Sequence, residues 1–336
     1  MLRFSSLFVR NASSNSFSMP RILITGANGQ LGGELAEALR GRFGPDAVLC
    51  TDIRVPAPSV QSSGAYFRYL DCTNKDDFAR LVVEHRITHI VHYAALLSAI
   101  GERNPKEALH LNMRGTEVAL EVAQNYGSVI MIPSSIAAFG PTTPRMNTPN
   151  ITIQRPNTIY GVSKVYAELL GEYYHKRFGV DFRCVRYPGI ISWKSAPGGG
   201  TTDWSNHAFF AACEPQSAYT CFVRPDTKMP LMYVPDCIKG TIDLMLADEK
   251  KLSCRTYNLN ALSFSPDDLA RAIRRHVPHF KIDYAPDMRQ AIADSWPVSL
   301  DDADARRDWG WQPQYSLEAL TADMLQNIMA QRAGKK

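Results

Sequence analysis

The chain has 336 residues, of which 45% are apolar and 21% are charged, and its formal net charge at pH 7 is +4. This length is sufficient for one large domain, or for one domain with a smaller lobe. Lysine and arginine are scattered and no apolar run approaches the ~20 residues of a membrane-spanning helix, so we expect neither nucleic acid nor membrane as a partner.

The seven cysteines are an odd number, and none of them forms a C-x-x-C pair. This pattern does not favour a disulfide framework or a zinc site. We therefore predict a reducing compartment and no metal site.

Residues 1–18 contain Arg3 and Arg10, are rich in serine and have no acidic side chain. This composition is typical of a mitochondrial transit peptide, with a disordered tail as the alternative. We expect the globular part to begin near Met19, and the protein to reside in the mitochondrial matrix or otherwise in the cytoplasm.

A buried strand is predicted at residues 21–25, and the residues after it have the spacing G-x-x-G-x-x-G. Leucines then recur at helical spacing. A strand, a glycine-rich turn and a helix are the context of a dinucleotide-binding fingerprint, because glycines let the backbone approach a pyrophosphate at the helix N-terminus. The alternative is a turn that serves only as a loop. The glycines are Gly26, Gly29 and Gly32.

The second predicted strand, residues 47–52, ends at Asp52. A carboxylate there hydrogen-bonds the adenosine ribose and repels a 2′-phosphate, which favours NAD over NADP. Arg54 argues the other way, because a guanidinium could pair with that phosphate, and Asp52 could also be a strand-end cap. A third strand is predicted at 65–70, and Asp71 after it is a candidate partner for the adenine.

A helix is predicted at 76–86 and a fourth strand at 89–95. His92 on this strand is expected to be a core histidine rather than a catalytic one. The small side chains of Ala94 and Ala95 would let a cofactor lie close to the end of the strand.

A long helix beginning at a proline is predicted over residues 105–126. Because asparagine is mildly unfavourable inside a helix, we expect Asn112 to have a hydrogen-bonding role. A fifth strand at 129–132 is followed by Ser134 and Ser135 at its carboxyl end, where ligands bind in open parallel sheets.

Tyr160 and Lys164 lie one turn apart on one face of a helix predicted at 157–178, after a loop at 140–158. An ammonium near a phenol lowers the pKa of the phenol, so such a tyrosine can act as a general base near neutral pH. By itself the pattern also occurs by chance on surface helices.

Strands and helices alternate over residues 20–190, with a sixth strand at 182–187. This alternation predicts an α/β fold with a Rossmann-type, doubly wound parallel sheet, followed by a smaller mixed substrate-binding lobe. We expect a cofactor-binding domain at 19–190 with 233–255 returning to it, and the lobe at 191–232 and 256–330.

These motifs resemble those of the short-chain dehydrogenases/reductases in their extended branch, and the similarity covers nearly the whole chain from Met19. It includes the glycine spacing, the separation of Ser135 from Tyr160, and the segments 186–189 and 233–236. Longer runs resemble the members of this branch that oxidise L-threonine at C3. These runs are residues 134–137, 139–144, 198–203, 295–297 and 308–311.

The resemblance implies NAD as cofactor, L-threonine as substrate and 2-amino-3-oxobutanoate as product. In this chemistry Tyr160 takes the hydroxyl proton as a phenolate, and Lys164 holds the phenolate and the nicotinamide ribose. The catalytic serine that hydrogen-bonds the reacting oxygen falls on Ser135 or Ser134, and the spacing to Tyr160 favours Ser135.

The resemblance also implies which residues bind the two ligands. Cofactor contacts are expected at Gly26, Asn28, Gly29, Gln30, Leu31, Gly32, Asp52, Asp71, Cys72, Tyr93, Ala94, Ala95, Asn112, Tyr160, Lys164, Tyr187, Pro188 and Ile190. Substrate contacts are expected at Ser98, Ser135, Tyr160, Thr201, Thr202 and Trp296. Alternatively, the serine and threonines outside the catalytic set are only loop or turn residues, and Trp296 is only lobe core.

A homodimer is a further implication of the resemblance, with the helices around 105–125 and 160–178 as its interface. Two other functions remain open: a nucleotide-sugar epimerase or dehydratase of the same branch, and a non-catalytic NAD-sensing binding protein. The Gly-Thr-Thr-Asp and Ser-Trp-Pro runs argue against the first. The presence of both Tyr160 and Lys164 argues against the second.

Overall fold

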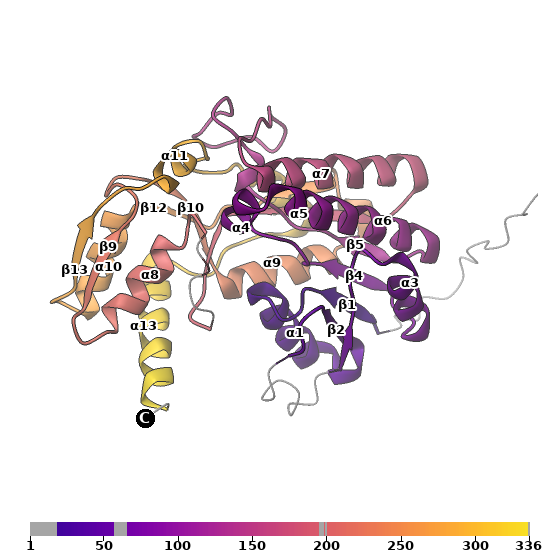
Figure 1. The fold of residues 1–336 in the computed structure, drawn as a ribbon, viewed down its shortest axis with the longest axis horizontal. Coiled ribbons are helices and arrows are strands. Elements are labelled where there is room, and N and C mark those ends of the chain that lie inside the picture. The colour runs from indigo at the N-terminus through magenta and orange to yellow at the C-terminus, as the bar shows by residue number, and fades with distance from the viewer. Residues whose placement is uncertain (1–18, 57–65, 195–197, 199, 335–336) are drawn as a thin grey trace, which may run out of the picture.

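The computed structural model describes residues 19–334 except 57–65, 195–197 and 199. The predicted targeting segment, residues 1–18, lies outside the described residues. Figure 1 shows two groups of elements: a large sheet covered by helices, and a smaller lobe that carries the C-terminal helix.

The large sheet confirms the predicted doubly wound arrangement. In the described part of the chain it has eight strands in the order β11-β7-β5-β4-β1-β2-β3, with β6 paired to β7, and all pairings are parallel. The strand order reverses between β1 and β4, and ligands bind beyond the carboxyl ends at such a point. The strands are β1 (Ile22–Thr25), β2 (Val48–Asp52), β3 (Phe67–Tyr69), β4 (His89–His92), β5 (Val129–Met131), β6 (Ser134–Ser135), β7 (Phe182–Tyr187) and β11 (Thr256–Asn258).

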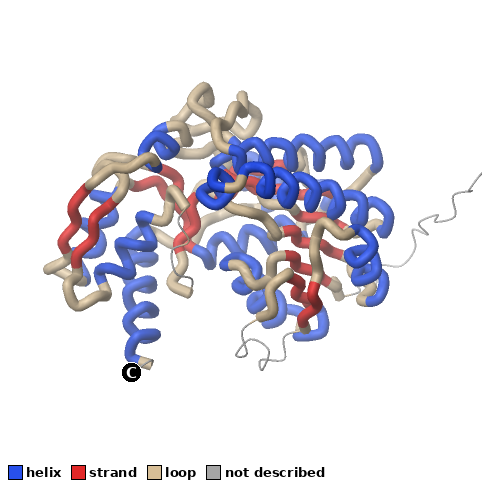
Figure 2. The backbone as a smooth tube through the Cα atoms, viewed as in Figure 1, coloured by secondary structure: helices blue, strands red, loops and turns tan. Residues whose placement is uncertain are grey.

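Helices lie on both faces of this sheet, as the ribbon in Figure 1 and the tube in Figure 2 show. On one face α6 packs against α3 and α7, and on the other α1 packs against α9. None of the described helices is long and apolar enough to cross a membrane. The helices here are α1 (Gln30–Phe43), α3 (Lys75–Glu84), α4 (Ser98–Arg103), α5 (Pro105–Leu109), the π-type η2 (His110–Arg114), α6 (Gly115–Tyr126), α7 (Ile159–Phe178) and α9 (Val234–Leu246).

Strand side chains alternate between the two faces of the sheet. In β1, Ile22 and Ile24 belong to the core that contains the buried leucines of α1, whereas Leu23 belongs to the core that contains those of α3 and α6. All residues of β1 and β2 are buried, which is why each strand begins with three consecutive apolar residues.

The smaller lobe shares its core with the large sheet. Trp204 and Phe209 of the lobe belong to the same buried cluster as Ile22 and Leu35. Its strands form two small sheets, β8-β10-β12 and β9-β13. The elements are β8 (Gly189–Ile191), α8 (Trp204–Ala212), β9 (Ala218–Cys221), β10 (Met229–Tyr233), β12 (Leu262–Phe264), α10 (Pro266–His276), β13 (Lys281–Tyr284), α11 (Arg289–Asp294), α12 (Ala303–Trp309) and α13 (Leu317–Ala333).

Some boundaries differ from the sequence-based prediction. Strand β4 ends at His92, so Ala94 and Ala95 lie in the loop beyond it. The short helix α4 was not predicted, and β11 joins the large sheet beyond residue 255, where the predicted return segment ends. A three-residue strand has no readable period, and β11 is defined by its pairing with β7 rather than by its own pattern.

Candidate active site

The predicted site residues follow strand ends at one edge of the large sheet. The glycine turn follows β1, Asp52 ends β2, and Ser134 and Ser135 form β6. Helix α7, which carries Tyr160, packs against β6 and against the short helix η3 (Ile136–Ala138) directly after it. Residues that are far apart in the sequence thus meet at the carboxyl edge of the sheet.

Two glycines shape the turn after β1. Gly26 has a φ of 66°, in the left-handed region, and a Cβ there would lie 2.8 Å from the backbone nitrogen of Ala94. A Cβ on Gly32 would lie 2.4 Å from the carbonyl oxygen of Gly26, so the first turn of α1 packs directly on the glycine turn. A turn this compact can approach a pyrophosphate closely at the N-terminus of α1.

Asp52 is buried at the end of β2 and is held by backbone groups. Asn28 N donates to its Oδ2 atom and Arg54 N donates to its Oδ1 atom, both at 3.0 Å. Arg54 Nε lies 3.5 Å from Oδ1, but the Arg54 side chain is 69% exposed. Asp52, which is expected to bind the adenosine ribose, and Arg54, which could instead pair with a 2′-phosphate, therefore lie next to each other at the end of β2.

A buried atom tests whether NAD fits this edge. Gln30 Nε2, at the first position of α1, is buried and has no hydrogen-bond partner among the described residues. A buried amide without a partner is costly, so this atom calls for a polar ligand at the helix N-terminus. Together with the compact turn and Asp52, it fits a dinucleotide.

Four other expected cofactor residues use their side chains within the protein. Asp71 Oδ1 accepts hydrogen bonds from the backbone and hydroxyl of Thr73, at 2.9 and 2.8 Å. The Cys72 side chain is buried, and the hydroxyls of Tyr93 and Tyr187 hydrogen-bond to each other at 3.0 Å. Their contacts with a cofactor would come from backbone groups or from the second carboxylate oxygen of Asp71.

The remaining expected cofactor residues lie at the same edge. Ala94 and Ala95 are half-buried beyond β4, and Pro188 lies between β7 and β8. Leu31 and Ile190 are partly buried and pack on the core that includes α1 and α9.

His92 is a core residue, as expected. It is 3% exposed, and its Nδ1 atom lies 2.9 Å from Thr25 Oγ1. Burial lowers the pKa of His92 to about 3, so the ring is neutral at physiological pH.

Thr158 and Gly161 define where α7 begins. The Thr158 hydroxyl caps the helix by accepting a hydrogen bond from Gly161 N at 3.1 Å. A Cβ on Gly161 would lie 2.2 Å from the carbonyl oxygen of Ala137, so only a glycine lets the helix lie this close to η3. The close approach brings Tyr160 to the segment that carries Ser135.

The two serines point to different partners. Ser135 lies beside the Tyr160 phenol, where its hydroxyl acts to lower the pKa of the phenol, whereas the Ser134 hydroxyl donates to Glu168 Oε1. The geometry therefore favours the same serine as the spacing did. Lys164 Nζ donates to the carbonyl oxygen of Pro133 at 2.7 Å and lies 5.4 Å from the centre of the Tyr160 ring.

Burial governs the pKa values of the tyrosine and the lysine. It raises the pKa of Tyr160 to about 12, although the neighbouring Ser135 hydroxyl opposes the rise. It lowers the pKa of Lys164 to about 8, against the influence of Cys184 and Glu168. The shift of Tyr160 is opposite to the lowering expected from the i, i+4 spacing, because desolvation outweighs the opposing influences and the ammonium donates to a carbonyl.

Asn112 has the hydrogen-bonding role expected of an asparagine inside a helix. Leu96 N donates to its Oδ1 atom at 2.8 Å, and its Nδ2 atom donates to Ser163 Oγ at 3.1 Å. It lies in the π-type segment η2, and such widened turns are frequent at functional sites. Asn112 thus links the loop after β4 to the residue beside Lys164.

Among the expected substrate residues outside the catalytic set, Trp296 belongs to the cluster nearest to Tyr160. It is buried in a small apolar cluster against which Tyr160 packs. Thr201 is buried and precedes α8, and Thr202 packs against Gly189. Ser98 is buried at the first position of α4.

Sequence reasoning missed the residues that hold these segments in place. Gly198 N and Gly200 N both donate to Asp203 Oδ2 at 2.8 Å. Arg145 Nε donates to the carbonyl oxygen of Trp296 at 3.0 Å. An aspartate after a glycine run is a recognisable loop-organising signal, whereas Arg145 and its partner are far apart in the sequence.

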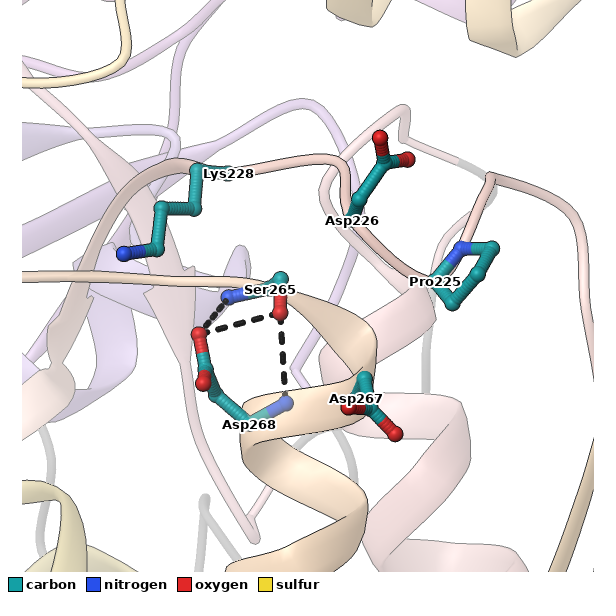
Figure 3. A pocket seen from close by; sticks show the side chains of 6 residues that line it. All are labelled: Pro225, Asp226, Lys228, Ser265, Asp267 and Asp268. Atoms are coloured by element: carbon teal, nitrogen blue, oxygen red, sulfur yellow. Dashed lines mark hydrogen bonds between the residues drawn. The ribbon is translucent and has the colours of Figure 1, made fainter.

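A surface hollow in the smaller lobe, shown in Figure 3, is unrelated to this edge. The Ser265 hydroxyl accepts a hydrogen bond from Asp268 N at 3.2 Å, and Asp268 Oδ2 accepts one from Ser265 N at 2.9 Å. These groups form the capping box of α10, far from α7 in Figure 1. The hollow is lined by Pro225, Asp226, Lys228, Ser265, Asp267 and Asp268.

The comparison with protein families covers most of the chain. The model of the NAD dependent epimerase/dehydratase family matches residues 22–259. This span contains the glycine turn, Asp52, both serines of β6, Tyr160 and Lys164.

Several similar proteins carry a name that refers to threonine. The mitochondrial L-threonine 3-dehydrogenase of Sus scrofa is 50% identical over 319 residues, which cover 94% of this chain and 85% of that protein. The crystal structure of L-threonine dehydrogenase from Phytophthora infestans has a TM-score of 0.89 and 47% identity, covering 93% of this chain and 99% of that one. A monomeric L-threonine 3-dehydrogenase from a metagenome has a TM-score of 0.88 and 40% identity, covering 92% and 99%.

Proposed function

The chain belongs to the NAD dependent epimerase/dehydratase family, and on this premise we propose that it oxidises L-threonine at C3 to 2-amino-3-oxobutanoate, with NAD as cofactor. The observation that carries the proposal is the meeting of Ser135, Tyr160 and Lys164 beside a glycine turn that fits a dinucleotide. The similar proteins named as threonine dehydrogenases support this substrate.

NAD, when bound, supplies the acceptor for the hydrogen that leaves C3 of threonine with its electron pair. The residues that would hold it are the glycine turn at 26–32, Gln30 and Asp52. The glycines allow close approach of the backbone, Gln30 offers an unpaired donor, and Asp52 offers carboxylate oxygens.

Tyr160 is the proposed acceptor of the C3 hydroxyl proton. A phenol with a pKa of about 12 is protonated at neutral pH, but Lys164 beside it has a pKa of about 8. Lys164, whose Nζ lies 5.4 Å from the centre of the Tyr160 ring, is therefore the group of the two that loses its proton first as the pH rises. In the proposed step, Tyr160 passes its own proton to the neutral amine of Lys164 as it accepts the substrate proton, and Ser135 hydrogen-bonds the reacting oxygen.

The substrate would be enclosed between the sheet edge and the lobe. L-Threonine is small, so one tryptophan, Trp296, can close the pocket beside Tyr160. Ser98, Thr201 and Thr202 offer hydroxyl and backbone groups for its amino and carboxylate groups.

We propose the division into cofactor-binding domain and substrate-binding lobe on the same grounds, with the first extended to Asn258 because β11 belongs to the large sheet.

The proposed location is the mitochondrial matrix. The arginine- and serine-rich composition of residues 1–18 supports it, and the Sus scrofa relative is named as mitochondrial. A fusion of residues 1–18 to a fluorescent protein should accumulate in mitochondria. A diffuse cytoplasmic signal would contradict the proposal.

The function is tested with the purified protein and a panel of substrates. The protein is incubated with NAD and, in separate samples, L-threonine, L-serine or UDP-glucose, while NADH absorbance is followed and products are identified by mass spectrometry. We expect NADH to form with L-threonine, together with 2-amino-3-oxobutanoate. Conversion of UDP-glucose without threonine oxidation would indicate an epimerase, and NAD binding without turnover would indicate a sensing protein.

A further inference from the structure

Helix α7 contacts the short segment around β6 along three successive turns. Its three contacting residues are spaced i, i+4 and i+8, so they lie on one face of the helix. The proposed mechanism gives roles to the helix residues of the first two contacts, Tyr160 and Lys164, but none to Glu168, the helix residue of the third. The contacts are Tyr160 with Ser135, Lys164 with Pro133, and Glu168 with Ser134.

Glu168 is 1% exposed, and its carboxylate is fully engaged. Arg186 donates to both carboxylate oxygens, from Nε at 2.9 Å and from Nη2 at 2.8 Å. Gln154 Nε2 donates to Oε2 at 2.8 Å, and the Ser134 hydroxyl donates to Oε1. The buried charge is therefore both paired and hydrogen-bonded.

Arg186 fixes Glu168 from the sheet. In the parallel pairing of β6 with β7, Arg186 lies beside Ser134, so both contact the carboxylate from neighbouring strands. Arg186 Nη1 also donates to the carbonyl oxygen of Asn150 at 2.7 Å and to Asn258 Oδ1 at 3.0 Å. The position of Glu168 is thus set by β7, β11 and the loop before α7, and not by β6 alone.

Strand β6 is short and needs such a contact. It has two residues, and in the described part of the chain it pairs with β7 alone. Few backbone hydrogen bonds hold a strand of this length, so the Ser134 hydroxyl adds a constraint next to Ser135. A buried ion pair often contributes no more stability than apolar side chains of the same volume, so stability alone does not account for Glu168 and Arg186.

We propose that Glu168 is a positioning residue that acts through Ser134 to set the place of the Ser135 hydroxyl against Tyr160. This role rests on the proposed function, since it concerns the same reaction. A displacement of ~1 Å at the reacting groups can cost a factor of ~10² in rate. Loss of the contact should therefore lower turnover, whereas NAD binding depends on the glycine turn after β1 and should be retained.

Ser134→Ala is the first test, because it removes one hydroxyl and leaves the Glu168–Arg186 pair intact. We expect kcat to fall by about 10- to 100-fold, with the KM for NAD unchanged within about twofold. Deuterium at C3 of the substrate should slow kcat at least as much as in the wild type, because chemistry becomes the slow step. Ser128→Ala is the matched control: Ser128 is also buried and donates one hydrogen bond, at 3.2 Å to the carbonyl oxygen of Ile87, and this variant should keep kcat.

Glu168→Gln is the second test, with Glu172→Gln as its control. Glu172 lies one turn further along α7 and accepts a hydrogen bond from Thr256 Oγ1 of β11 at 3.1 Å. We expect the first substitution to lower kcat and the second to leave it unchanged. Both substitutions disrupt the same contact between Ser134 and Glu168. The double variant Ser134→Ala/Glu168→Gln should therefore have a kcat no lower than that of the slower single variant. If Glu168→Gln does not fold because it leaves Arg186 unpaired, Ser134→Ala alone decides.

All variants are assayed on whichever substrate of the panel the wild type oxidises. An active wild type with an equally active Ser134→Ala variant overturns the positioning role and leaves the proposed function intact. A double variant whose fold-loss in kcat equals the product of the two single losses also overturns it. So does a Ser135→Ala variant with the kcat of the wild type. A wild type that oxidises nothing in the panel overturns both proposals.

Discussion

At Tyr160 and Lys164, the same burial acts on charges of opposite sign. It disfavours the phenolate and the ammonium alike, raising the pKa of the first to about 12 and lowering that of the second to about 8. A single charge in this site is costly, but an ammonium and a phenolate formed together compensate each other. The chemistry of the site therefore belongs to the pair rather than to the tyrosine alone.

The pH dependence of threonine oxidation follows from this pair. A general base works only after losing its proton, so kcat/KM should rise with pH through about 8, the pKa of Lys164. In Lys164→Met the remaining group is Tyr160, so the rise should move towards a pH of about 12. Lys176→Met, an exposed lysine on the same helix, is the control. An unchanged profile in Lys164→Met would contradict the account.

Asp52 should make the protein prefer NAD to NADP. Its carboxylate lies where the ribose 2′-hydroxyl is expected and repels a 2′-phosphate, whereas the guanidinium of Arg54 is largely exposed. The measurement is kcat/KM with each cofactor for the wild type and for Asp52→Asn. We expect a strong preference for NAD in the wild type and a smaller one in the variant. Equal efficiency of the two cofactors in the wild type would show that Arg54 decides.

Residue types and spacing were enough to predict the candidate pairs, but not their environment. The i, i+4 spacing correctly put Tyr160 and Lys164 on one helix face, and the separation of Ser135 from Tyr160 favoured the serine that contacts the phenol. The direction of the Tyr160 pKa shift was wrong, because the degree of burial depends on what packs around a side chain. Glu168 was missed because its partners lie on other elements.

At the scale of the element, the placement of α7 depends on a close approach at its first turn. Gly161 lies where a Cβ would come within 2.2 Å of the carbonyl oxygen of Ala137, so the helix start and η3 are nearly in contact. The sequence shows a glycine after Tyr160 without showing what it approaches. The long helices were predicted well because their periodicity is long, whereas β6, α4 and the π-type segment are too short or too irregular to have one.

Gly161→Ala should therefore damage both stability and turnover. Overpacking at such a contact typically costs about 1–3 kcal/mol, and relief by moving α7 would take Tyr160 away from Ser135. The measurements are thermal unfolding and kcat. The control is Gly41→Ala in α1, where a Cβ meets nothing within 4 Å and the helix should be stabilised by about 1 kcal/mol. A Gly161→Ala variant as stable and active as the wild type would contradict this explanation.

At the scale of the whole molecule, one apolar core connects the large sheet to the smaller lobe. The cluster that contains Ile22 of β1 also contains Trp204 of α8, so the two parts are not separate packing units. Strand–helix alternation predicted the sheet and its winding. It could not predict that β11 returns to this sheet, since long-range pairing is not encoded in local periodicity.

An exposed apolar stripe on α7 supports the predicted homodimer. Val162, Leu169 and Tyr173 are 42%, 59% and 54% exposed, and their spacing places them on one side of the helix. Two such helices from two copies could pair about a two-fold axis. We expect light scattering to give a dimer at micromolar concentration for the wild type and a monomer for Leu169→Lys. Met329→Lys, on α13, should remain dimeric, and a monomeric wild type would contradict the prediction.

The most direct test of the account is the turnover of Tyr160→Phe with L-threonine and NAD. The substitution removes one oxygen and keeps the ring that packs against the apolar cluster containing Trp296, so the fold and NAD binding should be retained. If Tyr160 accepts the substrate proton, kcat should fall by about 10²–10⁴ relative to the wild type. Tyr126→Phe, a half-exposed tyrosine at the end of α6, should keep full activity. A Tyr160→Phe variant that oxidises L-threonine at the wild-type rate would contradict the assignment of the active site.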